Sequence, residues 1–439
     1  MDATISEILQ FIEENDVKFI RLAFCDIFGN QKNIAIMPTE LPRAFEHGIH
    51  FNASALRGFL NVDASDLLLF PDPSTLSVLP WRPTQGRVVR FYCFIRYPDG
   101  TPFEGDGRHM LREAGRRARQ AGYAITMGTA SEFYLFELDE NSHPTTIPHD
   151  HGEYFDVAPL DKAENVRRQI CLTLEEMGIQ PESSHHEQGP GQNEVDFRYA
   201  EALAAADNFV TFKSVVKSMA LSSGLFASFL PKPLQGAPGS GLHLSVSILK
   251  DGQNLFHPSF EQADEGRRFV AGILRRAAEM TIFGNPLTNS FQRLGEYEAP
   301  KYITWSHQNH SPFLTVPLAA GGLANRMKVR AFDGCINPYI VFALLIHAGL
   351  DGIDQKLELP PACDENLFTA SDAVRAQYQS LPVSLCDAVR CAKDSAFIAR
   401  YLPRKAREAF FAAKQAEHDR VALADDRFAA ERALYFERY

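Results

Sequence analysis

The stretch from residue 185 to 197, which reads HHEQGPGQNEVDF, constrains the fold more than any other part of the sequence. Pro190 fixes its own φ and the glycines beside it permit sharp reversals, so we expect a tight connection followed by a short strand. The connection would bring two segments together, with Glu187 on one and Glu194 on the other. Two adjacent carboxylates repel unless a cation lies between them, and oxygen ligands favour Mg²⁺ or Mn²⁺ over zinc. The alternative is a solvated polar hairpin tip.

The composition narrows the class of protein. The chain has 439 residues, of which 45% are hydrophobic, enough for a sizeable core and for about two or three domains. Its net charge of −11 argues against nucleic acid or an anionic membrane as a partner. Seven scattered cysteines, without a Cys-x-x-Cys spacing, indicate reduced thiols and a cytoplasmic location. Neither a signal-peptide pattern nor an apolar run of about 18 residues is present, so no membrane association is expected.

The first 104 residues are expected to form a small unit composed mostly of strands. Its predicted elements are helices at 4–14 and 39–47, strands at 17–24, 33–37, 66–72 and 87–95, and a loop of small residues at 48–55. A cluster of turn-forming residues at 97–103 marks the predicted boundary between domains at 1–104 and 105–439.

Beyond this boundary, strands and helices are interleaved. The predicted helices are 108–122, 165–177, 202–222, 265–283 and 338–350, and the predicted strands are 125–138, 195–197, 226–229, 242–247 and 327–332. The remainder is expected to be largely helical. Polar residues that could carry chemistry lie on these strands or at their ends.

Several segments, taken together and in order, resemble the glutamine synthetase family along nearly the whole chain. They are residues 206–217, 229–234, 239–243, 289–294, 297–300 and 337–353. The resemblance implies an α+β fold, with an N-terminal β-grasp domain followed by an α/β catalytic domain. It also implies a homo-oligomer of stacked rings, possibly a dodecamer, with active sites between neighbouring subunits. The family reaction is ATP-dependent: a γ-carboxylate of a small-molecule substrate is phosphorylated, and an amine then displaces the phosphate.

The resemblance implies metal ligands as well. Glu132, Glu187 and Glu194 match a three-glutamate site for Mg²⁺ or Mn²⁺, and His243 matches a ligand of a second site near the ATP phosphates. The other two ligands of that second site are replaced. Ala130 lies at one glutamate position and Lys328 at the other. We therefore expect one metal ion, and ATP binding is in question.

Other positions implied by the resemblance are partly altered. Arg330 matches an arginine that pairs with substrate, and Glu298 matches a residue that closes over the site. Asn52 replaces an aspartate that binds ammonium, and His310 replaces an arginine that holds substrate. Ser247, Arg326 and His186 are assigned to nucleotide binding. An asparagine cannot act as a base near neutral pH, so ordinary glutamine synthesis is not expected.

Three functional classes remain. The first is a carboxylate–amine ligase of the γ-glutamyl type that uses a non-standard amine or acid. The second is a single-metal enzyme that does not use ATP, a hydrolase, lyase or isomerase in which Lys328 and His310 take part. The third is a non-catalytic ring-forming protein, against which the retained glutamates argue, because buried carboxylates without a purpose are costly.

Overall fold

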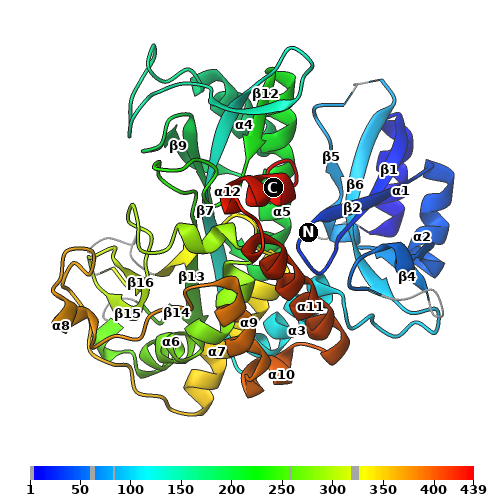
Figure 1. Cartoon of the computed structure of the whole chain (residues 1–439). Coiled ribbons are helices and arrows are strands. Elements are labelled where there is room, and N and C mark those ends of the chain that lie inside the picture. Colours follow the sequence, from blue (N-terminus) through cyan, green and yellow to red (C-terminus); the bar gives the residue numbers. More distant parts are fainter. Residues whose placement is uncertain (1–3, 60–64, 83–84, 257–259, 318–325) are drawn as a thin grey trace.

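Two sheets organise the computed structural model, which describes residues 4–59, 65–82, 85–256, 260–317 and 326–439. The smaller sheet is made of β1 (Val17–Cys25), β2 (Gln31–Ile36), β3 (Ile49–Asn52), β4 (Asp66–Pro71), β5 (Ser77–Val78) and β6 (Arg87–Arg96). Its strand order is β2-β1-β6-β4-β3, with β5 paired to β6. It forms the blue part on the right of Figure 1, with α1 (Ile5–Glu14) and α2 (Leu41–His47) beside it.

The larger sheet runs through the rest of the chain. Its strands are β7 (Tyr123–Leu138), β8 (Pro144–Pro148), β9 (Pro181–His186), β10 (Gln192–Phe197), β11 (Ala200–Glu201), β12 (Leu225–Ser228), β13 (Leu242–Lys250), β14 (Gln253–Asn254), β15 (Tyr302–Ser306), β16 (Pro312–Thr315) and β17 (Met327–Phe332). The main order is β15-β16-β17-β13-β7-β10-β9. All pairs in it are antiparallel except β15 with β16.

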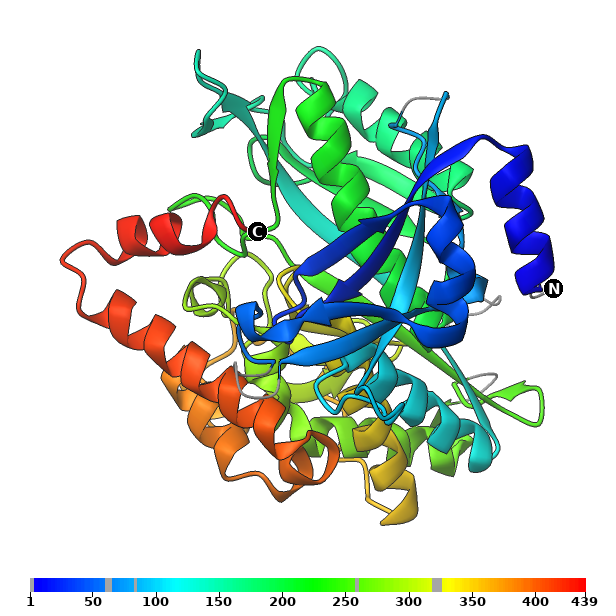
Figure 2. The same ribbon diagram turned by 90° about the vertical axis from the view of Figure 1, so that its right-hand side faces the viewer.

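Helices surround the larger sheet. They are α3 (Gly107–Gln120), α4 (Glu164–Glu176), α5 (Ala202–Ser222), α6 (Asp264–Gly284), α7 (Pro338–Asp354), α8 (Asp372–Arg375), α9 (Leu385–Lys393), α10 (Ala396–Tyr401), α11 (Arg404–Ala422) and α12 (Arg427–Tyr435). Figure 2 shows the small sheet in front of α5, with the C-terminal helices on the left. No helix among the described residues is long and apolar enough to cross a membrane.

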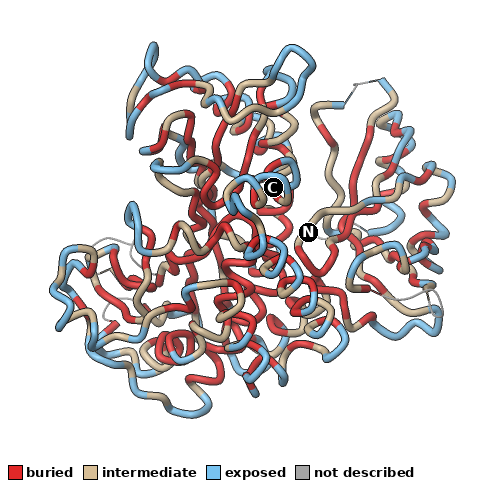
Figure 3. The backbone as a smooth tube through the Cα atoms, in the orientation of Figure 1, coloured by how far each residue is buried: buried red, intermediate tan, exposed pale blue. Residues whose placement is uncertain are grey.

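Helix α7 lies at the centre of the fold. Asn337 caps its start by accepting a hydrogen bond from the backbone N–H of Tyr339, and Pro338 occupies the first turn. Nearly all of its residues are buried, which fits a helix that is apolar on every face (Figure 3). It packs tightly on α6, because a Cβ added at Gly272 would lie 2.1 Å from the carbonyl oxygen of Ala348. Glycine is therefore required at this crossing.

The predicted helices and most of the predicted strands are present, with ends shifted by a few residues. The prediction of a loop at residues 48–55 is wrong in part, because Ile49–Asn52 forms edge strand β3, paired antiparallel with β4. Ile49 and Phe51 are buried while His50 and Asn52 are exposed. This two-residue alternation is the signal of a half-buried strand, and the small residues around it obscured it.

A buried polar network joins the small sheet to the larger part of the chain. The Arg108 guanidinium on α3 lies 2.9 Å from Asp72 and 2.8 Å from Asp207. The Tyr339 hydroxyl donates to Asp207 at 2.7 Å. Arg90 of β6 donates to Thr211 of α5 at 2.8 Å. These contacts fix how the two parts are oriented. Arg108 is compensated by two carboxylates, whereas the described partners of the Arg90 side chain are the hydroxyl groups of Tyr92 and Thr211.

His347 on α7 provides a test of this packing through pH. Its ring stacks on Tyr401 at 3.9 Å, and its Nδ1 lies 3.1 Å from an Arg117 nitrogen, so Nδ1 must accept. Burial first, and then Arg117 and Arg400, against a smaller opposing effect of Asp351, lower its pKa to about 3. A folded-state pKa below the unfolded value means that stability is lost as pH falls from about 6.5 toward 3, at up to about 1.4 kcal/mol per pH unit.

We therefore predict that His347→Gln, which keeps an acceptor for Arg117 but does not titrate in this range, loses less stability on acidification than the wild type. Thermal unfolding midpoints at pH 7.5 and pH 5 would measure this. An equal drop in both proteins would contradict the assigned protonation state.

Candidate metal and substrate site

Three neighbouring strands of the large sheet carry a row of two glutamates and one histidine. Glu194 on β10 lies directly opposite Glu132 on β7, and His185 on β9 lies directly opposite Glu194. Side chains at such positions are only about 5 Å apart at Cβ, and like charges there destabilise a sheet. The row therefore needs a compensating positive charge.

The β9–β10 hairpin adds a third carboxylate to this row. Gly191 has φ +69°, and a Cβ there would lie 2.8 Å from the carbonyl oxygen of Leu135, so only glycine fits. The Glu187 N–H donates to the Gln192 carbonyl at 2.8 Å, which closes the turn. The sequence prediction of a tight connection that presents Glu187 beside Glu194 is confirmed in this geometry.

Two overlapping sets of potential ligand atoms share Glu194. Glu132, Glu194 and His243 form one set, and His185, Glu187 and Glu194 form the other, with the atoms of each set within 4.8 Å of one another. His243 Nε2 lies 3.4 Å from Glu132 Oε1. His185 Nδ1 lies 3.6 Å from Glu187 Oε1, and His185 Nε2 lies 3.8 Å from Glu194 Oε1.

Burial raises the pKa of all three carboxylates in this cluster, and repulsion adds to the effect for Glu187 and Glu194. For Glu187, burial and then the negative charge of Glu132 raise the pKa to about 8. Burial and the Glu132 charge also raise the pKa of Glu194 well above its usual range. For Glu132, burial outweighs the hydrogen bond from Gly241 N–H and the charges of nearby arginines, so its pKa is also raised. A bound cation would reverse these shifts and release protons.

Cationic side chains border the acidic cluster on β17. Lys328 lies opposite Ser245 of β13 and Thr315 of β16. Burial and then Arg330 lower the pKa of Lys328, whereas Glu194 raises it. Across the described ranges no carboxylate oxygen lies within 4 Å of Lys328 Nζ, so its charge is not neutralised by a direct ion pair.

The three carboxylates, His243 and Lys328 line one cavity of about 360 Å³, whereas His185 lies outside it. The sequence-predicted residues that it brings together are Glu132, Glu187, Glu194, His243, Glu298, His310, Lys328 and Arg330. Tyr297 and Glu298 at its edge have φ of 44° and 66°, a left-handed conformation that non-glycine residues rarely adopt. Two such residues in succession indicate a strained segment over the cavity.

The other predicted site residues lie outside this cavity. Asn52 is exposed on β3, where its Oδ1 accepts from the backbone N–H and the hydroxyl of Ser54. Arg326 donates to the Tyr199 hydroxyl, and the Ser247 hydroxyl accepts from Asn254 at 2.7 Å. His186 is fully buried behind the hairpin.

Sequence reasoning missed the residues that hold the cluster in place. Asp150 accepts from His186 Nε2 at 2.8 Å and from the Gly191 N–H at 2.9 Å, so it fixes the hairpin turn from 41 residues away. Gln192 donates to Glu132 Oε2 at 3.1 Å. Gln192 lies within the stretch 185–197, and its position two residues before Glu194 could have suggested a supporting role. Asp150 carried no comparable local signal.

The donor sets fit a hard divalent cation. Glu194 has ligand atoms close to those of Glu132 and His243 on one side and to those of His185 and Glu187 on the other. Burial and repulsion favour the protonated forms of Glu187 and Glu194 when no cation is present, and the buried Nδ1 of His243 has no hydrogen-bond partner among the described residues. A second cation beside His243 fits poorly. Ala130, opposite His243, offers no ligand, and the ammonium of Lys328 repels a cation.

The chain is similar to known proteins in sequence and in structure. Residues 16–98 match the family model described as glutamine synthetase, beta-Grasp domain, and residues 104–433 match glutamine synthetase, catalytic domain. The glutamine synthetase of Clostridium saccharobutylicum is 43% identical over 422 residues, which cover 95% of this chain and 95% of that protein. The glutamine synthetase of Methanosarcina mazei is also 43% identical over 422 residues, which cover 95% of this chain and 94% of that protein. A solved structure described as a GmaS/ADP complex aligns with a TM-score of 0.87 at 27% identity, covering 99% of both chains.

We predict that Glu194→Gln weakens Mn²⁺ binding by at least about tenfold, because it removes a charge shared by both ligand sets. Isothermal titration calorimetry of the purified protein would measure this. Glu182→Gln, an exposed position on β9, is the matched control and should bind Mn²⁺ as the wild type does. Equal affinities for Glu194→Gln and the wild type would contradict the assignment.

Proposed function

The chain belongs to the glutamine synthetase family, and from this premise we propose that it is an ATP-dependent ligase that joins a carboxylate to an amine other than ammonia. The observation that carries the proposal is Lys328, whose side chain lines the cavity of the acidic cluster where the family resemblance places a metal-binding glutamate. The relatives named glutamine synthetase support the reaction class. The altered positions support a different second substrate.

The ammonium group of Lys328 would change how negative charge on a bound phosphate is compensated in the cavity. Two unit charges about 4 Å apart interact by about 4 kcal/mol at an effective dielectric of about 20. Lys328 would therefore disfavour a second cation and itself offset part of the negative charge of a transferred phosphoryl group. We propose one divalent cation, Mg²⁺ or Mn²⁺, held by Glu132, Glu187 and Glu194 with His243 nearby. When bound, this cation supplies charge neutralisation at the reacting oxygens.

The protein groups around the cation suit an acyl-transfer reaction. Arg330 lines the cavity, and its buried Nε has no hydrogen-bond partner in the described part of the chain, so it can pair with a substrate carboxylate. The carboxylate takes the γ-phosphoryl group of ATP, which gives an acyl phosphate and ADP. The amine then attacks the acyl carbon, phosphate leaves, and the amine nitrogen loses one proton. Glu298, on the strained segment, is placed to close over this intermediate and exclude water.

The proposed amine preference rests on Asn52 and His310. An aspartate at position 52 would attract ammonium by charge, and the neutral Asn52 removes that attraction. His310 is an exposed residue at the edge of the cavity, and partial desolvation and then Arg330 and Lys328 lower its pKa, which favours the neutral ring. A neutral ring in place of an arginine leaves a less charged wall that suits an alkyl group. The likeness to the GmaS/ADP complex supports nucleotide use in this architecture.

The single-metal, ATP-independent class is the second candidate. It is favoured by the same replacements, Ala130 and Lys328, because both remove ligands expected near the ATP phosphates. A non-catalytic ring protein is the third. Of the three classes, the ligase predicts ADP release and an amide product from glutamate, ATP and an amine.

We predict that the protein with glutamate, ATP and Mg²⁺ forms the γ-glutamyl amide of a primary alkylamine at least about tenfold more efficiently, in kcat/KM, than it forms glutamine from ammonia. The assay compares methylamine, ethylamine, 1,4-diaminobutane and ammonia, with ADP release and product mass as readouts. Glu187→Gln should lose both readouts, and Glu182→Gln should retain them. Preference for ammonia would contradict the proposed specificity. Absence of ADP with every amine would contradict the ligase class.

We also propose a cytoplasmic homo-oligomer of stacked rings, possibly a dodecamer. Asn52 lies in the small sheet, outside the cavity of its own chain, so a neighbouring subunit must supply it if it acts there. Closed symmetry is the usual way in which identical chains satisfy such a contact.

We predict that mixing two inactive variants, Asn52→Arg and Glu187→Gln, restores activity after dissociation and reassembly. If each site combines residue 52 of one chain with residue 187 of its neighbour, about a quarter of sites in a random mixture are wild type at both positions. Each variant reassembled alone is the control. Failure to regain activity, in mixtures that sediment as the wild-type oligomer, would contradict a shared site.

A further inference from the structure

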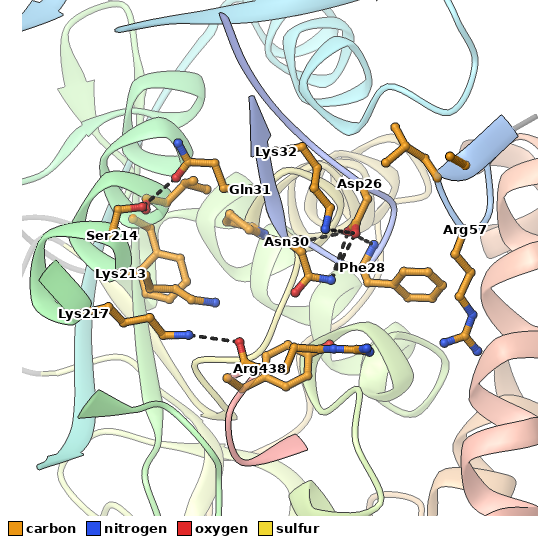
Figure 4. Close-up of a pocket in the computed structure, with 17 residues that line it drawn as sticks. Asp26, Phe28, Asn30, Gln31, Lys32, Arg57, Lys213, Ser214, Lys217 and Arg438 are labelled. Atoms are coloured by element: carbon orange, nitrogen blue, oxygen red, sulfur yellow. Dashed lines mark hydrogen bonds and ion pairs between the residues drawn. The ribbon is translucent and has the colours of Figure 1, made fainter. Parts of the chain in front are cut away.

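A second cavity, of about 500 Å³, lies between the small sheet and helix α5 (Figure 4). The turn from β1 to β2 forms one wall, α5 forms another, and residues 438–439 close a third side. It shares no lining residue with the cavity that contains the acidic cluster. The two cavities are therefore separate sites on the chain.

Positive charge predominates in this second cavity. Its lining cations are Lys32, Arg57, Lys213, Lys217 and Arg438. Asp26 also lines the cavity and is already engaged: its Oδ1 accepts from the backbone N–H groups of Phe28 and Asn30, each at 2.9 Å, and its Oδ2 lies 3.7 Å from Lys32 Nζ, whose charge it compensates. Arg57 lies 3.4 Å from Glu417, which compensates its charge. Lys213 and Lys217 of α5 differ from Arg57, because neither is paired with a carboxylate among the described residues.

Lys213 and Lys217 lack a carboxylate partner. They are one helical turn apart on α5, and Figure 4 shows both projecting into the cavity. Lys213 Nζ donates to the Gly334 carbonyl at 2.8 Å, and Lys217 Nζ donates to the Arg438 carbonyl at 3.0 Å. Across the parts of the chain that the structure describes, neither ammonium has a carboxylate oxygen within 4 Å. Each can donate two more hydrogen bonds.

Holding these two ammonium groups in the cavity is unfavourable. Burial, and then the charge of Lys213, lowers the pKa of Lys217 to about 8. Burial also lowers the pKa of Lys213, although Asp333 and Asp26 oppose this from a distance. Uncompensated ammonium groups destabilise a fold unless an anion neutralises them.

We propose that this cavity binds a small dianion bearing carboxylate or phosphate groups, held chiefly by Lys213 and Lys217. Residues one helical turn apart have Cβ atoms about 5–6 Å apart, so the two lysines enter the cavity as neighbours and can each meet one negative group of the same small molecule. Arg438 adds positive charge at the rim, and Asn30 and Gln31 supply neutral polar groups. The ring of Phe28 and the side chain of Val210 form an apolar wall that accommodates a short carbon chain.

The bound anion would join the two parts of the chain. Gln31 of β2 already accepts a hydrogen bond from Ser214 of α5 at 2.6 Å. Asn337 donates to the Asp26 carbonyl at 3.2 Å. An anion between α5 and the β1–β2 turn adds ionic contacts to this same junction. It therefore stabilises the packing of the small sheet against α5, and the effect should be visible in thermal unfolding.

The test uses the full-length protein with sodium phosphate or sodium malonate, against sodium chloride at matched ionic strength. Both calorimetric binding and a rise in the thermal unfolding midpoint are expected for the wild type with at least one of the two anions. Tighter binding of phosphate identifies a phosphorylated ligand, and tighter binding of malonate identifies a dicarboxylate. Binding of neither overturns the proposal.

Variants of Lys217 make the test specific. Lys217→Met should weaken anion binding by at least about tenfold, as expected for the loss of one charge-assisted hydrogen bond. Lys217→Arg should retain binding, and Lys393→Met, an exposed position on α9, is the charge-matched control. In anion-free buffer Lys217→Met should unfold at a higher temperature than the wild type, because it removes an uncompensated charge. Unchanged anion affinity in Lys217→Met, or a lower unfolding temperature, overturns the proposal.

Discussion

Repulsion among three neighbouring carboxylates, two of them buried and that of Glu132 partly buried, is the constraint on which the rest of the site depends. Glu132 and Glu194 face each other across two neighbouring strands, and the hairpin turn brings Glu187 beside them. Such an arrangement persists only if the surrounding structure holds it. The fold does so with long-range contacts: Asp150 anchors the hairpin through His186 and Gly191, and Gln192 and the Gly241 N–H hold Glu132. In our proposal, a divalent cation completes the balance.

Much of this arrangement could be predicted from the sequence, because its signals are local. The Gly-Pro-Gly turn at 189–191 predicted the hairpin, and alternating residues predicted β7, β13 and β17. The family resemblance predicted that Glu132, Glu187, Glu194 and His243 converge, and the structure brings them into one cavity. Residues whose role depends on distant partners were not predictable in this way. Asp150 is one example, and the pairing of edge strand β3 with β4 is another.

The fold contains two kinds of buried positive charge, paired and unpaired. Arg108 is paired with Asp72 and Asp207 at the junction of the two parts, so its charge is satisfied within the chain. Lys213 and Lys217 at the same junction donate to backbone carbonyls, and Lys213 also lies near the rings of Phe209 and Phe229, but neither lysine is paired with a carboxylate in the described segments. Lys328 likewise has no direct ion pair there. Charges that the fold leaves uncompensated indicate where ligands bind. In our proposals, an anion joins the junction and a phosphorylated intermediate meets Lys328.

The central claim is that Lys328 takes the place of a second cation, so that the acidic cluster holds a single ion. Electron paramagnetic resonance of the Mn²⁺-loaded protein tests it most directly, because two Mn²⁺ ions a few ångströms apart couple magnetically and an isolated ion does not. We predict the spectrum of isolated Mn²⁺ at saturation in the wild type, and a coupled pair only when Lys328→Glu is combined with Ala130→Glu. A coupled pair in the wild-type protein would contradict the claim.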